Sequence, residues 1–575
     1  MSEYDLVIRN GTVVDGEGGE PFRADVAISN GLIEKVGAVK GKGRQEIDAK
    51  GCFVTPGFVD VHTHYDGQIT WENTLSPSSN HGVTTVIMGN CGVGFAPTRA
   101  ADRELVIKLM EGVEDVPEVV MAEGVPWNWE TFPEYLDALD KRHADIDFAT
   151  QIPHSPLRVF VMGERGANIE PATDDDLARM RLLVSEAVRA GALGVSTSRN
   201  LFHRFRTGAL APSVGVHERE LLELARGLAD AESGVFQLIP YLHGDPDAEV
   251  EAIGEIAKAS GRAVNYSLIG FGGTWQSYID GVRGLVDQGL DVRAQFMVRP
   301  IGMLFGLDLS FHPFCLNPSY RPIANLPLAE RVARMRDPEL RARLLSEQPE
   351  DPNPAFVETV LLQGNLYYMD ESANYNFADK DNLMLKAERE GRPAKEVIYD
   401  ALLEDDGHAI LCRYSADLDT YLERTAKLFG QPLTIPGLGD GGAHYGMNCD
   451  AAYTTYLLAQ RVGEHGITLP QAVQSITSLA ARSVGLCDRG VLAPGYKADV
   501  NVIDMDRIKL HRPVVKTDLP AGGKRLTQRS EGYVATIVSG TVTYQEGQPT
   551  GELPGRLVRG EKKAPAIARE PALVG

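Results

Sequence analysis

The pattern of apolar and polar positions changes twice along the chain. Residues 5–57 hold short alternating stretches separated by turns such as Asn10-Gly11 and Asn30-Gly31, and an Asn-Gly pair is a strong hairpin signal. From about residue 58, short apolar runs alternate with amphipathic helical stretches, which predicts parallel strands joined by helical crossovers. Short strands return at 498–503 and 534–538.

The middle region predicts about eight strand–helix units, and therefore an α/β fold built on a (β/α)8 TIM barrel. The clearest helices are expected at 177–190, 218–231, 249–260 and 278–288. A charged, proline-containing stretch at about 299–430 predicts an insertion before the last strand, which caps the site or forms a subunit interface. The expected strands cover residues 58–61, 84–88, 148–152, 191–196, 235–239, 263–267, 292–296 and 433–436.

The two ends of the chain are each too small to fold comfortably alone. We therefore expect residues 1–57 and 483–556 to form one small β-sandwich domain, with the barrel at 58–482 between them in sequence. Residues 557–575 are expected to form a loosely held tail.

Composition narrows the range of partners. A formal net charge of −22 leaves no basic excess to neutralise phosphates, so a nucleic-acid partner is not expected. The N-terminus lacks the features of a secretory signal and no run is apolar enough to cross a bilayer, which predicts a cytoplasmic protein without a membrane partner. The six cysteines show no paired spacing, so no disulfide framework is expected. A homo-oligomer stays possible.

Two histidines at the end of the first predicted barrel strand are the strongest chemical signal. His62 and His64 are separated by one residue, so in an extended chain both imidazoles lie on the same face and could reach one ion. Functional side chains of such barrels lie at the carboxyl ends of the strands, where Cys91 and Asp440 are also expected. These four side chains would make a competent zinc site, which lowers the pKa of bound water to about 7.

Aspartate at position 440 could bind the metal through one oxygen and take the proton of the attacking water with the other. His154, just after the third strand, is a candidate for polarising the substrate, and His444 is a candidate substrate contact. Each residue also has an ordinary structural explanation. Cys91 could be a small buried residue in a tight turn, and His154 could only bond the backbone.

Several motifs together resemble the amidohydrolase superfamily, and most closely its D-aminoacylase (N-acyl-D-amino-acid deacylase) branch. The resemblance covers residues 4 to about 550. It implies a metal-dependent (β/α)8 barrel with a split β-sandwich, zinc as the usual metal, and amide hydrolysis by metal-bound hydroxide. It also implies that His62, His64, Cys91 and Asp440 are the metal ligands and that Asp440 is the base. The motifs are Val59-Asp60-Val61-His62-Thr63-His64, Gly82 to Val86 with Gly89-Asn90-Cys91-Gly92, Gly191 to Thr197, Gly437 to Gly441 and Gly490 to Asp499.

The chain departs from the family pattern at the fifth and sixth strands. Ile239 and Leu268 stand where that pattern has metal-binding histidines, and Gly270 stands where it has a lysine for the substrate carboxylate. The resemblance therefore implies one zinc or other divalent ion per chain. Arg199 and Arg299, also at strand ends, are the candidate replacements for the missing cation.

Three functional hypotheses follow. The first is a metal-dependent hydrolase of the amide C–N bond of an N-acyl amino acid, with a small-molecule amide as its partner. The second is a hydrolase of a cyclic or less polar amide, since such metal chemistry tolerates many leaving groups. The third is a non-catalytic binding protein with the same fold, motivated by the missing histidines at Ile239 and Leu268.

Overall fold

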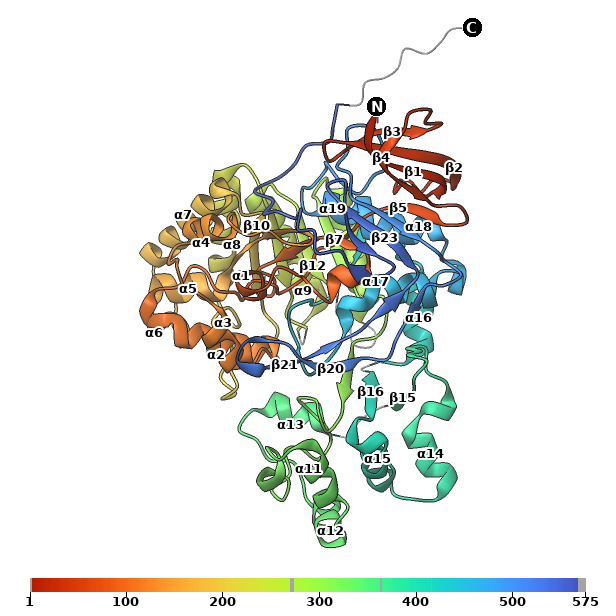
Figure 1. Ribbon diagram of the computed structural model, residues 1–575. Helices are drawn as coiled ribbons and strands as arrows, with labels where there is room; N and C mark the ends of the chain where they lie inside the picture. Colours follow the sequence, from red (N-terminus) through yellow and green to blue (C-terminus); the bar gives the residue numbers. More distant parts are fainter. Residues whose placement is uncertain (1–2, 243, 269–273, 362–364, 415, 567–575) are drawn as a thin grey trace.

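The computed structural model describes residues 3–242, 244–268, 274–361, 365–414 and 416–566. Figure 1 shows three parts: a β-sheet unit at the top, an α/β barrel in the middle, and a helical insertion at the bottom. Among the described residues, no helix combines the length and the apolar character needed to cross a bilayer.

Both ends of the chain contribute to one 9-stranded sheet, as the pattern of short strands predicts. The junction between the two ends is the antiparallel pairing of β5 (Phe53–Pro56) with β18 (Val500–Ile503). The core of this unit draws on both ends, with Val54 and Val500 both fully buried. The other strands of the sheet are β1 (Tyr4–Val13), β2 (Phe22–Ser29), β3 (Leu32–Gly37), β4 (Gly43–Asp48), β23 (Tyr533–Val538), β24 (Thr541–Gln545) and β25 (Gln548–Pro549).

The middle region contains parallel strands in the expected order. One sheet has the strand order β6-β7-β8 and the other has the order β9-β10-β11-β12-β13-β17. The short strands β8 and β9 are separated by one residue in the chain and together form the third barrel strand. The strands are β6 (Phe58–Asp60), β7 (Val83–Met88), β8 (Asp147–Thr150), β9 (Ile152–Pro153), β10 (Gly194–Ser198), β11 (Val235–Ile239), β12 (Val264–Ser267), β13 (Val292–Phe296) and β17 (Thr434–Pro436).

The barrel closes just beyond the carboxyl ends of its first and last strands. Thr63 and Gly441 form a parallel bridge there. The His64 N–H donates to the Gly441 carbonyl at 2.7 Å, and the Asp440 N–H donates to the His62 carbonyl at 3.1 Å. The segment with two histidines is thereby placed beside Asp440.

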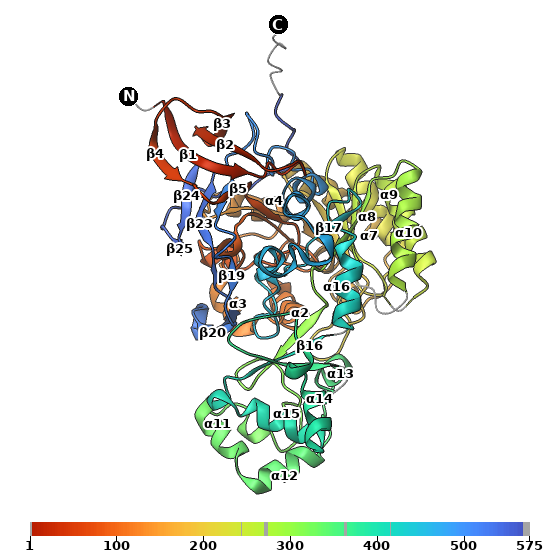
Figure 2. The same ribbon diagram turned by 90° about the vertical axis from the view of Figure 1, so that its right-hand side faces the viewer.

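Helices cover the outside of the barrel. The sequence of α8 (Glu218–Ala231) shows why it forms, because Leu221, Leu224, Ala225 and Leu228 are buried at helical spacing. Figure 2 shows α7, α8, α9 and α10 stacked side by side along one flank. The other three helices of this group are α7 (Asp174–Ala190), α9 (Pro246–Ser260) and α10 (Thr274–Asp287).

The long connection between β7 and β8 holds helices that the sequence analysis does not predict. They are α2 (Arg103–Glu114), α3 (Glu118–Gly124) and α4 (Phe132–Leu139). The first of these, α2, ends at Glu114 beside the candidate site.

The insertion between β13 and β17 has a hydrophobic core of its own. The antiparallel sheet β14-β16-β15 connects it to the barrel, and Figure 1 shows its helices projecting below. At its root, Ser310 donates through Oγ to Asp115 Oδ2 at 2.7 Å, next to the end of α2. The elements are β14 (Gly302–Phe305), β15 (Leu366–Met369), β16 (Ile410–Tyr414), α11 (Leu328–Met335), α12 (Pro338–Ser346), α13 (Pro354–Val360), α14 (Leu383–Glu390) and α15 (Ala394–Leu402).

The start of the predicted loose tail is bound to the barrel, which corrects that expectation. The Val558 N–H donates to the Phe148 carbonyl at 2.8 Å, and the Gly560 N–H donates to the Gly191 carbonyl at 2.8 Å. Backbone groups of a strand and a turn of the barrel thus find partners in the tail. Residues 567–575 and Gly270 lie outside the described residues.

Candidate metal centre

His62 and His64 lie just after β6, on either side of the bridge residue Thr63. Thr63 between them donates through both its backbone N–H and its Oγ1 to the Ile87 carbonyl, at 3.0 and 2.7 Å. This pairing holds Thr63 toward the second strand, and alternation along the chain turns both imidazoles the other way. Both side chains are buried.

Cys91 belongs to a turn that follows β7. Its φ of 56° is unusual for a residue with a side chain and indicates local strain, which concentrates at functional sites. The preceding Asn90 holds the turn, because its Nδ2 donates to the carbonyls of Ile87 and Thr63 at 2.8 and 3.2 Å. Asp66 also supports it by accepting from the Gly89 N–H at 3.1 Å. The turn therefore presents the thiol toward the two histidines.

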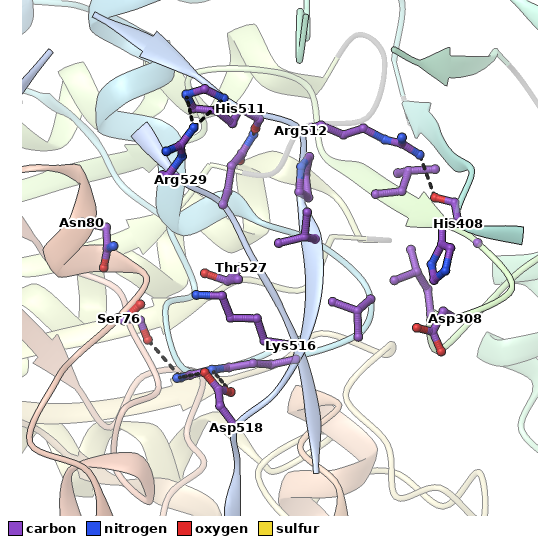
Figure 3. A pocket seen from close by; sticks show the side chains of 18 of the residues that line it. Ser76, Asn80, Asp308, His408, His511, Arg512, Lys516, Asp518, Thr527 and Arg529 are labelled. Atoms are coloured by element: carbon purple, nitrogen blue, oxygen red, sulfur yellow. Dashed lines mark hydrogen bonds and ion pairs between the residues drawn. The ribbon is translucent and has the colours of Figure 1, made fainter. Parts of the chain in front are cut away.

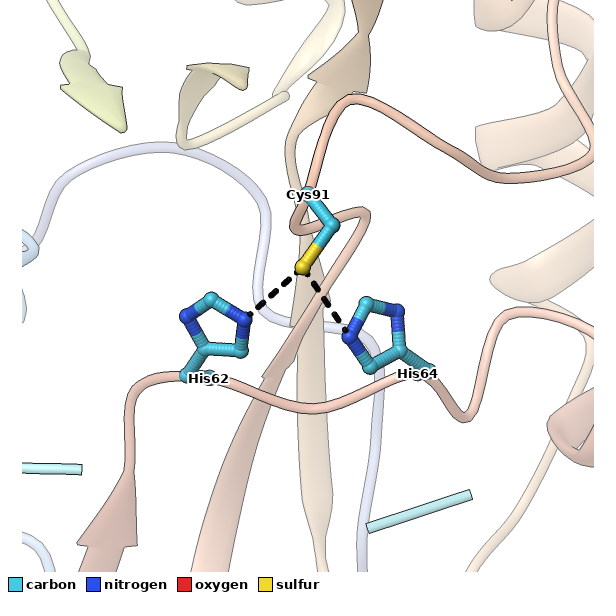
Figure 4. A group of neighbouring side chains, drawn as sticks. All are labelled: His62, His64 and Cys91. Atoms are coloured by element: carbon cyan, nitrogen blue, oxygen red, sulfur yellow. Dashed lines mark hydrogen bonds between the residues drawn. The ribbon is translucent and has the colours of Figure 1, made fainter. Parts of the chain in front are cut away.

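Figure 4 shows the Cys91 thiol between the His62 and His64 rings. Sγ lies 3.2 Å from His62 Nε2 and 3.6 Å from His64 Nε2, and the three donor atoms all lie within 4.8 Å of one another. Asp440 completes the group from the loop after β17, with its Oδ1 3.5 Å from His62 Nε2 and 3.8 Å from His64 Nε2. We call His62, His64, Cys91 and Asp440 the four-donor site.

Four of the six donor-to-donor distances in the four-donor site suit a tetrahedral ion. Zinc bonds of about 2.0–2.3 Å place neighbouring ligand atoms roughly 3.3–3.8 Å apart. The donor distances given above, from 3.2 to 3.8 Å, cover this range. Imidazole, thiolate and carboxylate are also the donor types that zinc uses. The residues present therefore fit the metal that the sequence predicts.

His62 is oriented by a partner behind it. Its Nδ1 lies 3.1 Å from Gln295 Oε1, an amide oxygen on β13 that can only accept a hydrogen bond. The proton of the imidazole is thereby held on Nδ1, and the lone pair of Nε2 points to Cys91 and Asp440. Such partners behind metal-binding histidines commonly fix the tautomer.

Glu114, the last residue of α2, occupies the corresponding position behind His64. Its Oε1 lies 3.5 Å from His64 Nδ1, and its Oε2 lies 3.6 Å from His444 Nε2. Sequence reasoning missed this residue because it did not predict α2. A signal was present: Val106, Met110 and Val113 form an apolar stripe, and a carboxylate at 114 continues that stripe.

His444 belongs to the same cluster. Its Nε2 lies 3.8 Å from Asp440 Oδ2, and its backbone N–H donates to the Glu114 carbonyl at 2.5 Å. Like Cys91 and Asp440, it has a positive φ, at 51°. The sequence suggests His444 as a substrate contact, and the structure places it beside the free oxygen of Asp440.

Burial dominates the electrostatics of the centre. It lowers the pKa of His62 to about 4 and the pKa of His64 well below the ordinary value. It raises the pKa values of the Cys91 thiol and of the Glu114 and Asp440 carboxyls well above their ordinary values. In the absence of a cation the centre thus favours neutral groups. A divalent ion would reverse this preference at its ligands and release protons as it binds.

His154 does not join this centre, which corrects the expected substrate-polarising role. It begins α5 (His154–Met162), with Nδ1 2.8 Å from Thr197 Oγ1 and Nε2 2.8 Å from Glu220 Oε1. Arg158 donates to the same Glu220 oxygen at 2.8 Å. Both ring nitrogens are therefore engaged inside the protein, and neither is left for a substrate.

The two arginines suggested for the substrate carboxylate are already paired. Arg199 contacts Glu249 at 2.7 Å, and the buried Arg299 contacts Asp450 at 2.5 Å. The Arg299 guanidinium also stacks on the Tyr375 ring, 3.8 Å from its centroid. These contacts indicate structural roles and correct the expectation that either arginine receives the substrate.

Two apolar side chains stand at the ends of the fifth and sixth strands. Ile239 ends β11 and Leu268 follows β12, and both are buried. Neither side chain offers a metal ligand. The position of Gly270, where the family pattern has a lysine, lies outside the described residues.

A cavity of about 910 Å³ lies apart from the four-donor site, and its lining includes none of the four residues. Figure 3 shows its mixed charges. Arg512 there contacts Glu371 and Asp405 at 2.8 and 3.1 Å, and Arg525 contacts Asp518 at 2.9 Å. Since many of its charges are satisfied within the protein, we interpret it as a crevice between structural elements.

A smaller cavity, of about 440 Å³, adjoins the end of α2. Asp115, Arg206 and Ser310 line it together with Phe356. Asp115 follows Glu114 directly, and its Oδ2 also accepts from the Gly446 N–H at 3.0 Å. The cavity wall and the metal centre are therefore linked through adjoining residues.

Comparisons with known proteins identify the family. A family model described as the amidohydrolase family matches residues 45–544. The chain belongs to the amidohydrolase family. It is thus a hydrolase of the kind that acts on carbon–nitrogen bonds other than peptide bonds.

Full-length relatives carry deacylase names. A D-aminoacylase of Alcaligenes xylosoxydans xylosoxydans is 26% identical over 96% of this chain and 97% of its own length. An N-acyl-D-aspartate deacylase of the same organism is 27% identical, with 97% and 95% covered. The solved structure of an N-acyl-D-glutamate deacylase from Bordetella bronchiseptica, complexed with zinc and a phosphonate inhibitor, shares 23% identity and covers 97% of this chain and 100% of that one, with a TM-score of 0.65. That structural likeness supports the barrel and β-sandwich fold.

Proposed function

We propose that this amidohydrolase cleaves the amide C–N bond of an N-acyl amino acid or a related acyl amide, using one divalent ion in the four-donor site, with zinc as the first candidate. The observation that carries the proposal is the convergence of two imidazoles, a thiol and a carboxylate, with the thiol and the carboxylate each 3.2–3.8 Å from the two Nε2 atoms. The deacylase names of full-length relatives support the substrate class.

The ion, when bound, would polarise the amide carbonyl and lower the pKa of water to about 7. The chain's own part is proton handling. Asp440 Oδ1 faces the two metal-binding histidines, while Oδ2 faces His444 at 3.8 Å. One oxygen can thus hold the ion while the other accepts the proton of the attacking water and passes it to the leaving nitrogen.

The smaller cavity also lacks the four donor residues in its lining, but it includes Asp115, which follows Glu114, and we propose it as the cavity for an acyl amide substrate. Its lining combines apolar rings such as Phe356 with the guanidinium of Arg206, which lies 5.5 Å from the centroid of that ring. Within the described residues Arg206 makes no ion pair, unlike Arg199 and Arg299. We propose Arg206 as the group that attracts a carboxylate on the substrate.

A cyclic or less polar amide is the second candidate. It is favoured by the buried Ile239 and Leu268, which replace polar side chains at two strand ends with apolar ones. Amine release or ring opening distinguishes the two candidates directly.

The test combines metal content with turnover. Zinc per chain is measured for the wild type, Cys91→Ala and Asp440→Asn, with the buried Cys52→Ala of the β-sheet unit as the matched thiol control. Each protein is then assayed on N-acyl D- and L-amino acids, aryl amides and cyclic amides. We expect one ion per chain in the wild type and the control, a loss of metal in the two site variants, and turnover of at least one acyl amide. A wild type that holds its ion and hydrolyses no member of the panel would contradict the proposal.

A further inference from the structure

We propose that Glu114 is a positioning residue of the metal centre, which holds His64 in its metal-binding tautomer and ties His444 to the same carboxylate. This inference rests on the proposed function, in that it assumes that the four-donor site binds an ion. It concerns a residue at the end of α2, a helix in the connection between β7 and β8, outside the barrel strands.

The first step concerns which nitrogen of His64 must stay unprotonated. Nε2 is the atom that faces Cys91 and Asp440, at 3.6 and 3.8 Å. A nitrogen donates its lone pair to a metal only when it carries no proton, so the imidazole proton must be on Nδ1. A proton on a buried Nδ1 needs an acceptor, because water cannot reach it.

The second step identifies that acceptor. Glu114 Oε1 is 3.5 Å from Nδ1, and both atoms are buried. The Glu114 carboxyl also faces the Cys91 thiol, so it borders two of the four donors. The Oε1–Nδ1 distance is long for a hydrogen bond, and such contacts commonly tighten when a site is loaded. Metal binding at Nε2 makes the N–H on the opposite side a stronger donor, which draws the two groups together.

The third step is the parallel with His62. That ring has the same arrangement, with Nε2 toward the centre and Nδ1 3.1 Å from an acceptor, Gln295 Oε1. Two histidines of one site thus each have an oxygen acceptor behind them, one from a barrel strand and one from α2. An isolated carboxylate at this depth would be costly, so a role for Glu114 at the centre explains its burial.

The second oxygen of Glu114 extends the arrangement to His444. Oε2 lies 3.6 Å from His444 Nε2, and the Glu114 carbonyl accepts from the backbone N–H of His444. The imidazole that approaches Asp440 Oδ2 is therefore held by side chain and backbone of one residue. Movement of α2 would displace both imidazoles together.

The test measures metal affinity, so it does not depend on turnover. Zinc dissociation constants are determined by competition with a chromophoric chelator for the wild type, Glu114→Gln, Glu114→Ala and the control Glu111→Gln. Glu111 lies one turn earlier on the same helix and makes no ion pair in the described residues. Thermal unfolding and the visible spectrum of the cobalt-loaded protein show whether each variant keeps its fold and its ligand geometry.

We expect Glu114→Ala to raise the dissociation constant about 10–100-fold, the range typical of lost partners behind metal ligands, with one ion still bound at saturation. Glu114→Gln keeps one acceptor oxygen, so its zinc dissociation constant should rise less than that of Glu114→Ala. The dissociation constant of Glu111→Gln should match the wild type. An unchanged affinity in a folded Glu114→Ala protein would overturn the proposal. So would two ions per wild-type chain with one lost in Glu114→Gln, because Glu114 would then be a direct ligand. Failure of amide hydrolysis alone would refute the proposed function and leave this inference standing.

Discussion

The backbone N–H of His64 donates to the carbonyl of Gly441 at 2.7 Å, across the seam where the first and last barrel strands meet. This hydrogen bond joins residues that are far apart in sequence. Because three of the four candidate donors, His62, His64 and Asp440, follow the two strands at the seam, closing the barrel also brings these donors together. Disturbing the seam should therefore affect stability and metal binding together.

Gly442 offers a direct way to disturb this seam. Its φ is +87°, and an added Cβ would lie 2.8 Å from the carbonyl carbon of His64. We expect Gly442→Ala to lower the free energy of unfolding by roughly 2–4 kcal/mol, from backbone strain plus overpacking, and to weaken zinc binding. Gly261 also has a positive φ but has open space around it, so Gly261→Ala should cost only about 1 kcal/mol and leave zinc binding intact. Urea unfolding and zinc titration of both variants measure the two effects. Equal changes in unfolding free energy and zinc affinity for Gly442→Ala and Gly261→Ala would contradict the prediction.

Gln295 should matter through His62 alone. Gln295→Leu removes the acceptor behind Nδ1 and leaves a buried N–H without a partner, so we expect the zinc dissociation constant to rise about 10–100-fold. Gln295→Glu keeps an acceptor oxygen and should retain more affinity than the leucine variant. Chelator competition measures both. If the two variants bind zinc equally well, tautomer control by this residue is refuted.

Much of the barrel follows from local pattern. The helices expected at 177–190 and 218–231 correspond to α7 and α8, because in both the apolar residues recur at helical spacing between clear ends. The convergence of His62 and Asp440 also follows from sequence, since closure of an eight-stranded barrel brings its first and last strands together. Topology alone is enough for that part of the site.

The remaining features depend on tertiary packing. Glu114 lies on a helix in the β7–β8 connection, and no local signal places the end of that helix behind His64. His154 has the strand-end position of a catalytic residue, yet Thr197 and Glu220 take up both its nitrogens. A position at a strand end indicates a candidate catalytic residue. It does not show whether other side chains of the fold already occupy its hydrogen-bonding groups.

Asp147 links the barrel to the β-sheet unit through a buried ion cluster. Its Oδ2 lies 2.8 Å from both Arg489 Nη1 and Lys497 Nζ. Asp147→Asn removes one carboxylate from these cations, while Lys497 keeps Asp499 at 2.7 Å and Arg489 keeps Asp488 at 2.9 Å, so we expect a loss of about 1–3 kcal/mol in the free energy of unfolding at pH 7. Asp137, whose side chain is 69% exposed, pairs with Arg559 at 2.7 Å, and Asp137→Asn should cost under about 1 kcal/mol. If urea unfolding shows the same loss of unfolding free energy for Asp147→Asn and Asp137→Asn, the buried ion pair is no more important than the exposed one.

The pH dependence of stability should report the same cluster. Burial raises the pKa of Asp147, but Lys497 and Arg489 outweigh burial and bring the pKa down to about 2 from 3.8. A folded pKa below the unfolded value adds stability above the unfolded pKa, and that stability is lost as pH falls from about 4 to 2. We expect the wild type to lose this contribution, about 2 kcal/mol, over that window, and Asp147→Asn to lack it. Urea unfolding in steps from pH 6 to pH 2.5 measures the difference between the two curves, and parallel curves would refute the assignment.

Arg206 is the proposed binding group for a substrate carboxylate, so its role can be tested with charged and neutral substrates. If its guanidinium attracts a substrate carboxylate, Arg206→Ala should raise KM for N-acyl amino acids by roughly 10-fold or more, the loss of about 1.4–3 kcal/mol expected for a charge-assisted contact. The matched neutral amides of the same amino acids should be used equally well by both proteins, since they lack the negative charge. Arg331 lines the same cavity but already approaches Asp308 at 3.9 Å and donates to the Tyr320 hydroxyl at 3.3 Å, so Arg331→Ala is the matched cation control. Steady-state kinetics on paired acids and amides separates the cases. A loss shared by acids and amides would mean that Arg206 shapes the cavity without recognising charge, and a larger acid-specific loss in Arg331→Ala would move the carboxylate site to that residue.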